Sequence, residues 1–164
     1  MTDVLAVLAD EVAQLRREVR ALTDKAAIVA LVDRFVTGLD HPDPDFCDED
    51  WFRSVFTEDV VLDLPNGKHH GVAGLPGFFR APKLMWDRTH HFTANCVVET
   101  DGAGDRAVVR ANVHATHVPH PGDERPLFTG GATYGATAVR TPDGWRLGSL
   151  TTSVVWIEGA PDAH

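Results

Sequence analysis

The stretch "RTHHFTAN" (residues 88–95) begins the first of four long segments with the sequence pattern of β-strands. These segments cover about 89–99, 106–118, 127–140 and 145–157. The residues between them, "DGAGD", "PHPGDERP" and "TPDG", are rich in turn formers. Helical patterns dominate the chain before residue 89. Helices followed by an antiparallel run of strands predict an α+β fold.

Two successive helices are expected at the N-terminus. Over residues 3–22, leucine and valine residues recur at intervals that alternate between three and four positions, which is the pattern of a coiled-coil seam. Thr23 is expected to cap a second helix that ends near Asp40, where "DHPDPDF" interrupts the pattern. The seam comprises Leu5, Leu8, Val12, Leu15, Val19 and Leu22, and the apolar stripe of the second helix comprises Ile28, Leu31, Val32, Phe35, Val36 and Leu39.

The seam has two interpretations. It is either a dimerising arm or one face of a helix that lies on its own domain, and its heptad spacing slightly favours a partner. The predicted organisation is an N-terminal helix (1–22), one domain (23–158) and a short tail (159–164). A homodimer or higher homo-oligomer is expected.

Composition excludes several classes of protein. The formal net charge is −9, from 24 acidic and 15 basic residues, which argues against nucleic-acid and anionic-membrane partners. Cys47 and Cys96 have no paired spacing and are expected to be free thiols in a reducing compartment. The N-terminus lacks a signal-peptide pattern, and no apolar run reaches membrane-spanning length. These features predict a cytoplasmic protein.

The histidines of "HATHVPH" invite a metal interpretation, but their spacing opposes it. On a strand, His114 and His117 face opposite sides, and His120 lies roughly 20 Å from His114 at about 3.3 Å per residue. Zinc requires ligands that converge on one point. No metal site is therefore expected.

Strand alternation sorts the polar residues into faces. His90 and His91 must point to opposite sides of their strand, and His91 shares a face with Asn95. In the next segment Asn112 and His114 share a face, so His91 and His114 could enter the same cavity. From the pattern alone, a solvated polar face explains these histidines equally well.

Several short motifs in this order resemble the nuclear transport factor 2-like superfamily, in its SnoaL-like branch. They are "GLDHPD", "WFRSVFTEDVVLD", "THHFTAN", "RANVHATHVPH", "GGATYGATAVRTPDGWRL" and "VVWIEG", spread over about residues 24–158. The resemblance implies a curved sheet wrapped around helices to form a cone with an apolar pocket. It includes both enzymes and proteins that only bind or assemble, so the fold alone does not identify a function.

At the level of the site, the sequence resembles hexachlorocyclohexane dehydrochlorinase and scytalone dehydratase. Asp40 and His91 match an aspartate–histidine base in both enzymes, His114 matches a second histidine in the dehydratase, and Arg140 falls near an arginine of the dehydrochlorinase. This implies that His91 faces the pocket and His90 faces away. It also implies catalysis without a cofactor or metal.

The substrate-holding positions depart from the dehydratase. Leu39 and Leu64 replace tyrosines, Ala136 replaces an asparagine and Tyr134 replaces a serine, which implies a more apolar substrate. Asn95, Asn112 and Tyr134 are candidates to bind a substrate oxygen. The expected substrate-binding set is Asn95, Asn112, Tyr134, Arg140, Leu39, Leu64 and Trp86.

These observations predict a lyase that removes water from a small apolar secondary metabolite, such as a polyketide or terpenoid. His91 would be the base, Asp40 its orienting partner and His114 an assisting acid or hydrogen-bond donor. One alternative is an isomerase or cyclase that uses the same pocket by enolisation. Another is a cone protein that binds small molecules or assembles without catalysis.

Overall fold

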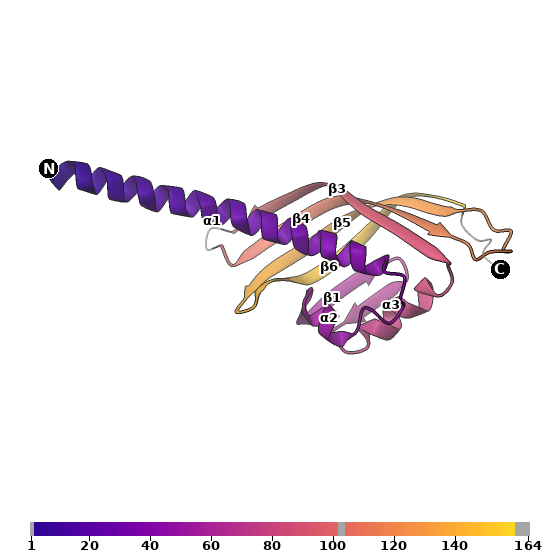
Figure 1. Cartoon of the computed structure of the whole chain (residues 1–164). Helices are drawn as coiled ribbons and strands as arrows, with labels where there is room; N and C mark the ends of the chain where they lie inside the picture. The colour runs from indigo at the N-terminus through magenta and orange to yellow at the C-terminus, as the bar shows by residue number, and fades with distance from the viewer. Residues whose placement is uncertain (1, 102–103, 160–164) are drawn as a thin grey trace.

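The computed structural model describes residues 2–101 and 104–159 and shows one long helix lying across a curved sheet (Figure 1). This arrangement confirms the predicted α+β fold with a mostly antiparallel sheet. In chain order the elements are α1 (Thr2–Leu39), α2 (Glu49–Arg53), β1 (Phe56–Leu64), β2 (Gly67–His70), α3 (Leu75–Lys83), β3 (Arg88–Thr100), β4 (Arg106–Val118), β5 (Phe128–Thr141) and β6 (Gly144–Glu158).

The sheet has six strands in the order β2-β1-β6-β5-β4-β3. Only β1 and β6 pair in parallel, and the other neighbours are antiparallel. Extra residues interrupt the register of β1, β3 and β6, and such bulges bend strands and increase their twist. The sheet therefore curves around the C-terminal half of α1 (Figure 1).

The core fills the concave side of the sheet. Alternate residues of β4 are buried, because successive side chains of a strand point to opposite faces. They pack against the stripe of α1 around Ile28 and Phe35, both nearly inaccessible to solvent. The largest fully buried side chains are Phe35, Phe52, Phe56, Ile28, Leu62, Leu75, Leu147 and Leu150.

The expectation that Thr23 begins a second helix is wrong. Residues 2–39 form one continuous helix, and the Thr23 hydroxyl donates a hydrogen bond to the Val19 carbonyl at 2.9 Å. Thr can bond the carbonyl four residues earlier inside a helix as readily as it caps one. The predicted boundary after residue 22 therefore falls within α1. Of the predicted tail, only Gly159 belongs to the described residues.

The hairpin formed by β1 and β2 is not among the features predicted from the sequence. Leu64 pairs with Gly67 across a turn formed by Pro65 and Asn66. The second strand, β2, has only four residues, and they are mostly exposed, so their sequence carries no apolar alternation.

Candidate active site

An apolar cavity of about 520 Å³ opens between the C-terminal end of α1, helix α3 and the concave side of β3–β6. This volume suits a small organic molecule. The lining is largely aromatic and aliphatic, with a few polar side chains at one end. The aromatic residues of the lining are Phe35, Phe79, Trp86, Phe128, Tyr134 and Trp156.

Asp40 and His91 meet at the wall of this cavity, brought from the end of α1 and from β3. The Asp40 carboxylate accepts a hydrogen bond from His91 Nδ1 at 2.6 Å and from the His91 backbone N–H at 2.5 Å. The hydroxyl of Thr89, on the same face of β3, donates to Asp40 Oδ1 at 2.8 Å. Only 18% of the Asp40 side chain and 12% of the His91 side chain are exposed, so the pair is screened from water.

These contacts lower the pKa of Asp40 and orient the His91 ring. Burial by itself would raise the pKa of Asp40, but the hydrogen bonds from His91 and Thr89, with the charge of His91, outweigh it and lower that pKa. The ionised carboxylate can only accept hydrogen bonds, so Nδ1 of neutral His91 carries the ring proton. Nε2 then has a free lone pair, and no other group in the described residues hydrogen-bonds to it. An imidazole with this tautomer can act as a base.

His117 on β4 is the second histidine in the cavity. Its ring stands edge-on to that of His91, with centroids 5.4 Å apart, and it also contacts Trp86 and Phe128. Burial and then the charge of His91 lower the pKa of His117 to about 4, so its ring is neutral at neutral pH. Its Nδ1 is buried without a partner among the described residues.

The Tyr134 side chain from β5 also borders the cavity. Burial, reinforced by the charge of Asp40, raises the pKa of its hydroxyl, which therefore remains protonated and can donate a hydrogen bond. Burial also raises the pKa of the Cys47 thiol to about 11, and the thiol donates to the Gly38 carbonyl at 3.3 Å. Cys47 is thus a poor nucleophile at neutral pH.

Lys83 of α3 holds the chain on both sides of Asp40. Its ammonium group donates to the carbonyls of Leu39, at 3.0 Å, and of His41. A cation is favourable here because the last carbonyls of a helix carry partial negative charge. Lys83 therefore fixes the end of α1 from which the Asp40 carboxylate reaches His91.

The expectation that His114 shares the cavity with His91 is wrong. The buried residues of β4 before His114 are Ala107, Val109, Ala111 and Val113, so His114 and Asn112 lie on the opposite face of the sheet. There the His114 ring stacks on Phe92, with centroids 5.0 Å apart, and its Nε2 is 3.3 Å from the Thr129 hydroxyl. The alternation already indicated this: odd-numbered β4 residues are apolar up to Ala115, and His117 follows in the same series.

Asn95 does not border the cavity either. It occupies an extra residue in β3, where the register with β4 shifts between Ala94 and Val97, and its φ is 53°. Beyond this bulge the faces exchange, so Cys96 and Val98 turn inward and Asn95 is exposed. A strict alternation counted from His91 could not detect the change.

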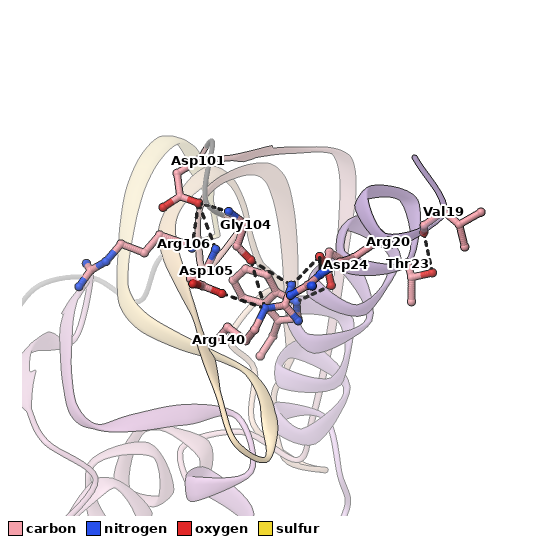
Figure 2. A network of polar contacts seen from close by, with 10 residues as sticks. Val19, Arg20, Thr23, Asp24, Asp101, Gly104, Asp105, Arg106 and Arg140 are labelled. Carbon is pink, nitrogen blue, oxygen red and sulfur yellow. Dashed lines mark hydrogen bonds and ion pairs between the residues drawn. The ribbon is translucent and has the colours of Figure 1, made fainter. Parts of the chain in front are cut away.

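Arg140 lies in a separate network at the other end of β5 (Figure 2). It pairs with Asp24 of α1 at 2.5 Å and with Asp105 at 3.3 Å, and its guanidinium covers the Trp145 ring at 4.5 Å. The Trp145 indole also donates to Asp24, at 3.2 Å. The role predicted for Arg140 in substrate binding does not agree with this position.

The remaining predicted residues, Leu39, Leu64 and Trp86, do line the cavity. In the described parts of the chain, no cluster of three or more His, Cys, Asp or Glu side chains is arranged to hold a metal ion. None of the helices described is long and apolar enough to cross a membrane.

Comparison with known proteins identifies the fold and the family. The model of the SnoaL-like domain matches residues 20–151. The solved structure of Kfla4162 from Kribbella flavida is 29% identical, with a TM-score of 0.73, and the match covers 84% of this chain and 95% of that one. No curated protein matches the chain.

Two further structures share the fold at lower identity. A candidate scytalone dehydratase from Novosphingobium aromaticivorans is 20% identical, with a TM-score of 0.74 and coverage of 88% of this chain and 92% of that one. Hexachlorocyclohexane dehydrochlorinase LinA-type3 from Novosphingobium barchaimii is 18% identical, with a TM-score of 0.68 and coverage of 90% and 97%. Because the family model spans most of the chain, the chain belongs to the SnoaL-like domain family.

Proposed function

We propose that this protein is a cofactor-independent lyase that removes water from a small apolar molecule. The observation that carries this proposal is the Asp40–His91 pair, because His91 lines an apolar cavity of about 520 Å³ and its Nδ1 is bonded to Asp40, which leaves Nε2 for a substrate. A binding protein needs no oriented base in its cavity, whereas elimination requires one. An apolar secondary metabolite such as a polyketide or terpenoid suits the lining.

In the proposed reaction His91 Nε2 takes a proton from a carbon next to the one that bears the hydroxyl. The C–H electron pair becomes the new C=C bond, and the C–O bond breaks. The imidazolium returns the same proton to the departing hydroxyl, so the products are an alkene and water and the enzyme is regenerated. Asp40 stabilises the imidazolium and keeps the ring in the required orientation.

His117 takes the place of His114 as the second histidine of the site, and Tyr134 remains a candidate to bind a substrate oxygen. Neutral His117 can donate one hydrogen bond, and the protonated Tyr134 hydroxyl can donate another. Donors that face developing negative charge in a cavity screened from water stabilise a transition state strongly. We assign His117 to the departing hydroxyl because its ring is adjacent to that of His91.

The similarity to a candidate scytalone dehydratase and to a dehydrochlorinase supports an elimination. Without a leaving group, the same proton abstraction would give isomerisation or cyclisation through an enolate. Product mass separates these reactions, because dehydration loses one water and isomerisation conserves mass. A protein that only binds its ligand would produce no change in mass.

Dehydration is tested with a panel of hydroxylated polyketide-type ketones and terpenoid alcohols, followed by mass spectrometry. With a substrate that reacts, His91→Ala and Asp40→Asn should each reduce turnover by roughly 10² or more. The double variant should be little worse than the more severe single one, because the pair acts as a unit.

His114→Ala is the matched control, since it removes an imidazole from the opposite face of the sheet. It should retain wild-type turnover, whereas His117→Ala should not. Melting curves and activity per folded molecule separate catalysis from stability. Near-normal turnover in a folded His91→Ala protein would reject the proposal and leave a ligand-binding cavity.

A further inference from the structure

The N-terminal half of α1 extends well beyond the sheet as an isolated rod (Figure 1). It carries an unusual number of exposed large apolar side chains, with 45% to 69% of each accessible to solvent. Helices of this length are marginal without tertiary packing, and exposed apolar patches mark interaction surfaces. The exposed residues are Val4, Leu5, Val7, Leu8, Val12, Leu15, Val19 and Leu22.

Six of these residues form a continuous seam, defined as Leu5, Leu8, Val12, Leu15, Val19 and Leu22. In heptad notation Leu5, Val12 and Val19 occupy position a, and Leu8, Leu15 and Leu22 occupy position d. The first buried residues beyond the seam, Asp24, Ile28 and Leu31, fall at positions f and c, and further along the helix burial extends to Val32 and Val36. The f position is opposite the a/d seam, and 45% to 69% of each seam residue is exposed, so the domain does not cover the seam.

The seam also borders a groove of about 430 Å³. Val12, Leu15 and Val19 line it along the rod, and Asp24 and Arg140 close it at the root. The interpretation in which this helix lies on its own domain is therefore rejected. The apolar face is open to another molecule.

We propose that the seam binds the seam of a second copy of this chain, forming a parallel two-stranded coiled coil. Val at two a positions and Leu at every d position is the combination that favours two parallel strands. Residues 2–19 precede the part of the chain that matches the family model, so this contact is an addition to the family fold.

Charge selects the parallel orientation. In a parallel pair Glu11, at position g, faces Arg16, at position e of the second copy, and symmetry makes this ion pair twice. In an antiparallel pair with fully overlapped seams, Glu11 would instead face Glu18 of the second copy, also twice. Like charges there would weaken the antiparallel alignment.

The position of the cone domains is compatible with this pairing. Next to the seam, each domain packs on Asp24, Ile28 and Leu31 of its own helix, at f and c positions that lie on the outside of a coiled coil. Two domains at the same end of a parallel coil therefore lie on opposite sides of its axis. The network of Asp24, Arg140 and Trp145 fixes the direction in which each rod leaves its domain (Figure 2).

The first test compares particle masses of the full chain by sedimentation velocity. Leu8→Glu/Leu15→Glu places charges in the seam and should halve the mass of the wild-type particle. Ala6→Glu/Ala13→Glu adds the same charges at outward-facing b positions and should retain the wild-type mass. An equal mass for all three proteins would overturn the proposal. A mass of one third of wild type for Leu8→Glu/Leu15→Glu would also overturn it, because the wild-type particle would then be a trimer.

The second test determines orientation. In the parallel coil position 15 meets its own copy, so oxidised Leu15→Cys should form a crosslinked dimer that wild type, with half-buried Cys47 and Cys96, does not. In the antiparallel alignment Leu15 faces Val12, and Leu15→Cys alone would not crosslink.

Charge substitutions provide an independent test of whether the two helices are parallel. Glu11→Arg should weaken a parallel dimer by about tenfold, because two favourable pairs become repulsive. Glu11→Arg/Arg16→Glu should restore it. A tighter dimer with Glu11→Arg would support the antiparallel coil and reject the parallel one.

Discussion

His91 and His117 are adjacent imidazoles whose surroundings give them different chemistry. His91 donates to an ionised carboxylate, which stabilises its protonated form during a reaction. His117 has no such partner in the described structure, and burial among Trp86 and Phe128 keeps it neutral. Two similar side chains with different environments are a common basis for assigning acid–base roles.

The lowered pKa of His117 makes stability depend on pH. Between its ordinary pKa of 6.5 and its folded value of about 4, the unfolded chain binds a proton that the folded chain does not. Stability should therefore increase with pH in this range, with a contribution of at most about 1.4 kcal/mol per pH unit. Urea unfolding of wild type and His117→Phe from pH 4 to 7 measures how the free energy of unfolding depends on pH. Equal slopes for the two proteins would contradict the assignment.

Lys83 is expected to act through Asp40. Lys83→Met retains the aliphatic stem but removes the clamp on the Leu39 and His41 carbonyls. Turnover should decrease by about 10- to 100-fold with little change in KM, because a small displacement of a catalytic pair is costly. Lys83→Arg should partly rescue it. The control Lys68→Met removes a surface ion pair with Asp63, and an equal loss there would refute the role of Lys83.

At the scale of elements, the bulge in β3 separates the part of the strand that forms the candidate site from the part that packs in the core. Before Asn95, the inward residues Thr89 and His91 form the site, and after it Cys96 and Val98 join the core. The extra residue is needed because a strand without it would turn Val98 outward. Asn tolerates the positive φ at this position better than most residues.

Substitution of Asn95 should reveal this backbone requirement. Asn95→Val should destabilise the protein by about 1–2 kcal/mol, since a β-branched residue is strained at positive φ. Asn95→Gly should be at least as stable as wild type. Ala94→Val, at the neighbouring exposed strand position, controls for added apolar surface. Urea unfolding measures all three, and an unaffected Asn95→Val protein would show that the bulge relaxes.

At the scale of the whole molecule, the Asp24 network joins α1 to the far end of the sheet. Burial alone would raise the pKa of Asp24, but hydrogen bonds from Arg140 and Trp145 and the charges of Arg140 and Arg20 lower it below 3.8. The contribution of ionised Asp24 to the free energy of unfolding is therefore complete above pH 3.8. It is lost as the pH falls through the lower pKa that Asp24 has in the folded protein. This network is distant from the cavity and is structural.

Arg140→Met should cost about 1–3 kcal/mol at neutral pH, because Asp24 loses a charged donor while it remains buried. The difference from wild type should decrease as the pH falls from 3.8 through the lower folded pKa of Asp24, where the carboxylate becomes protonated. Arg106→Met, at an exposed position on β4, is the control. Turnover per folded molecule should be unchanged, and a large loss of turnover would place Arg140 in the active site after all.

The amino-acid sequence by itself determined the order of elements and the polar end of α1. Alternation and turn formers located the four long strands, because local side-chain direction follows directly from strand geometry. The same alternation could have placed His117 in the cavity. The sequence predicts the wrong face for His117 only when the polar residues of β4 are expected to be the functional ones.

The tertiary structure alone decided which end of each strand borders the cavity. β5 has 14 residues and spans roughly 46 Å at about 3.3 Å per residue, so Tyr134 reaches the cavity while Arg140, on the same strand, lies at the root of α1. Curvature and bulges set this division, and both depend on contacts between segments far apart in the chain. A local pattern contains no information about such contacts, which is why the sequence alone misplaces Asn95 and Arg140.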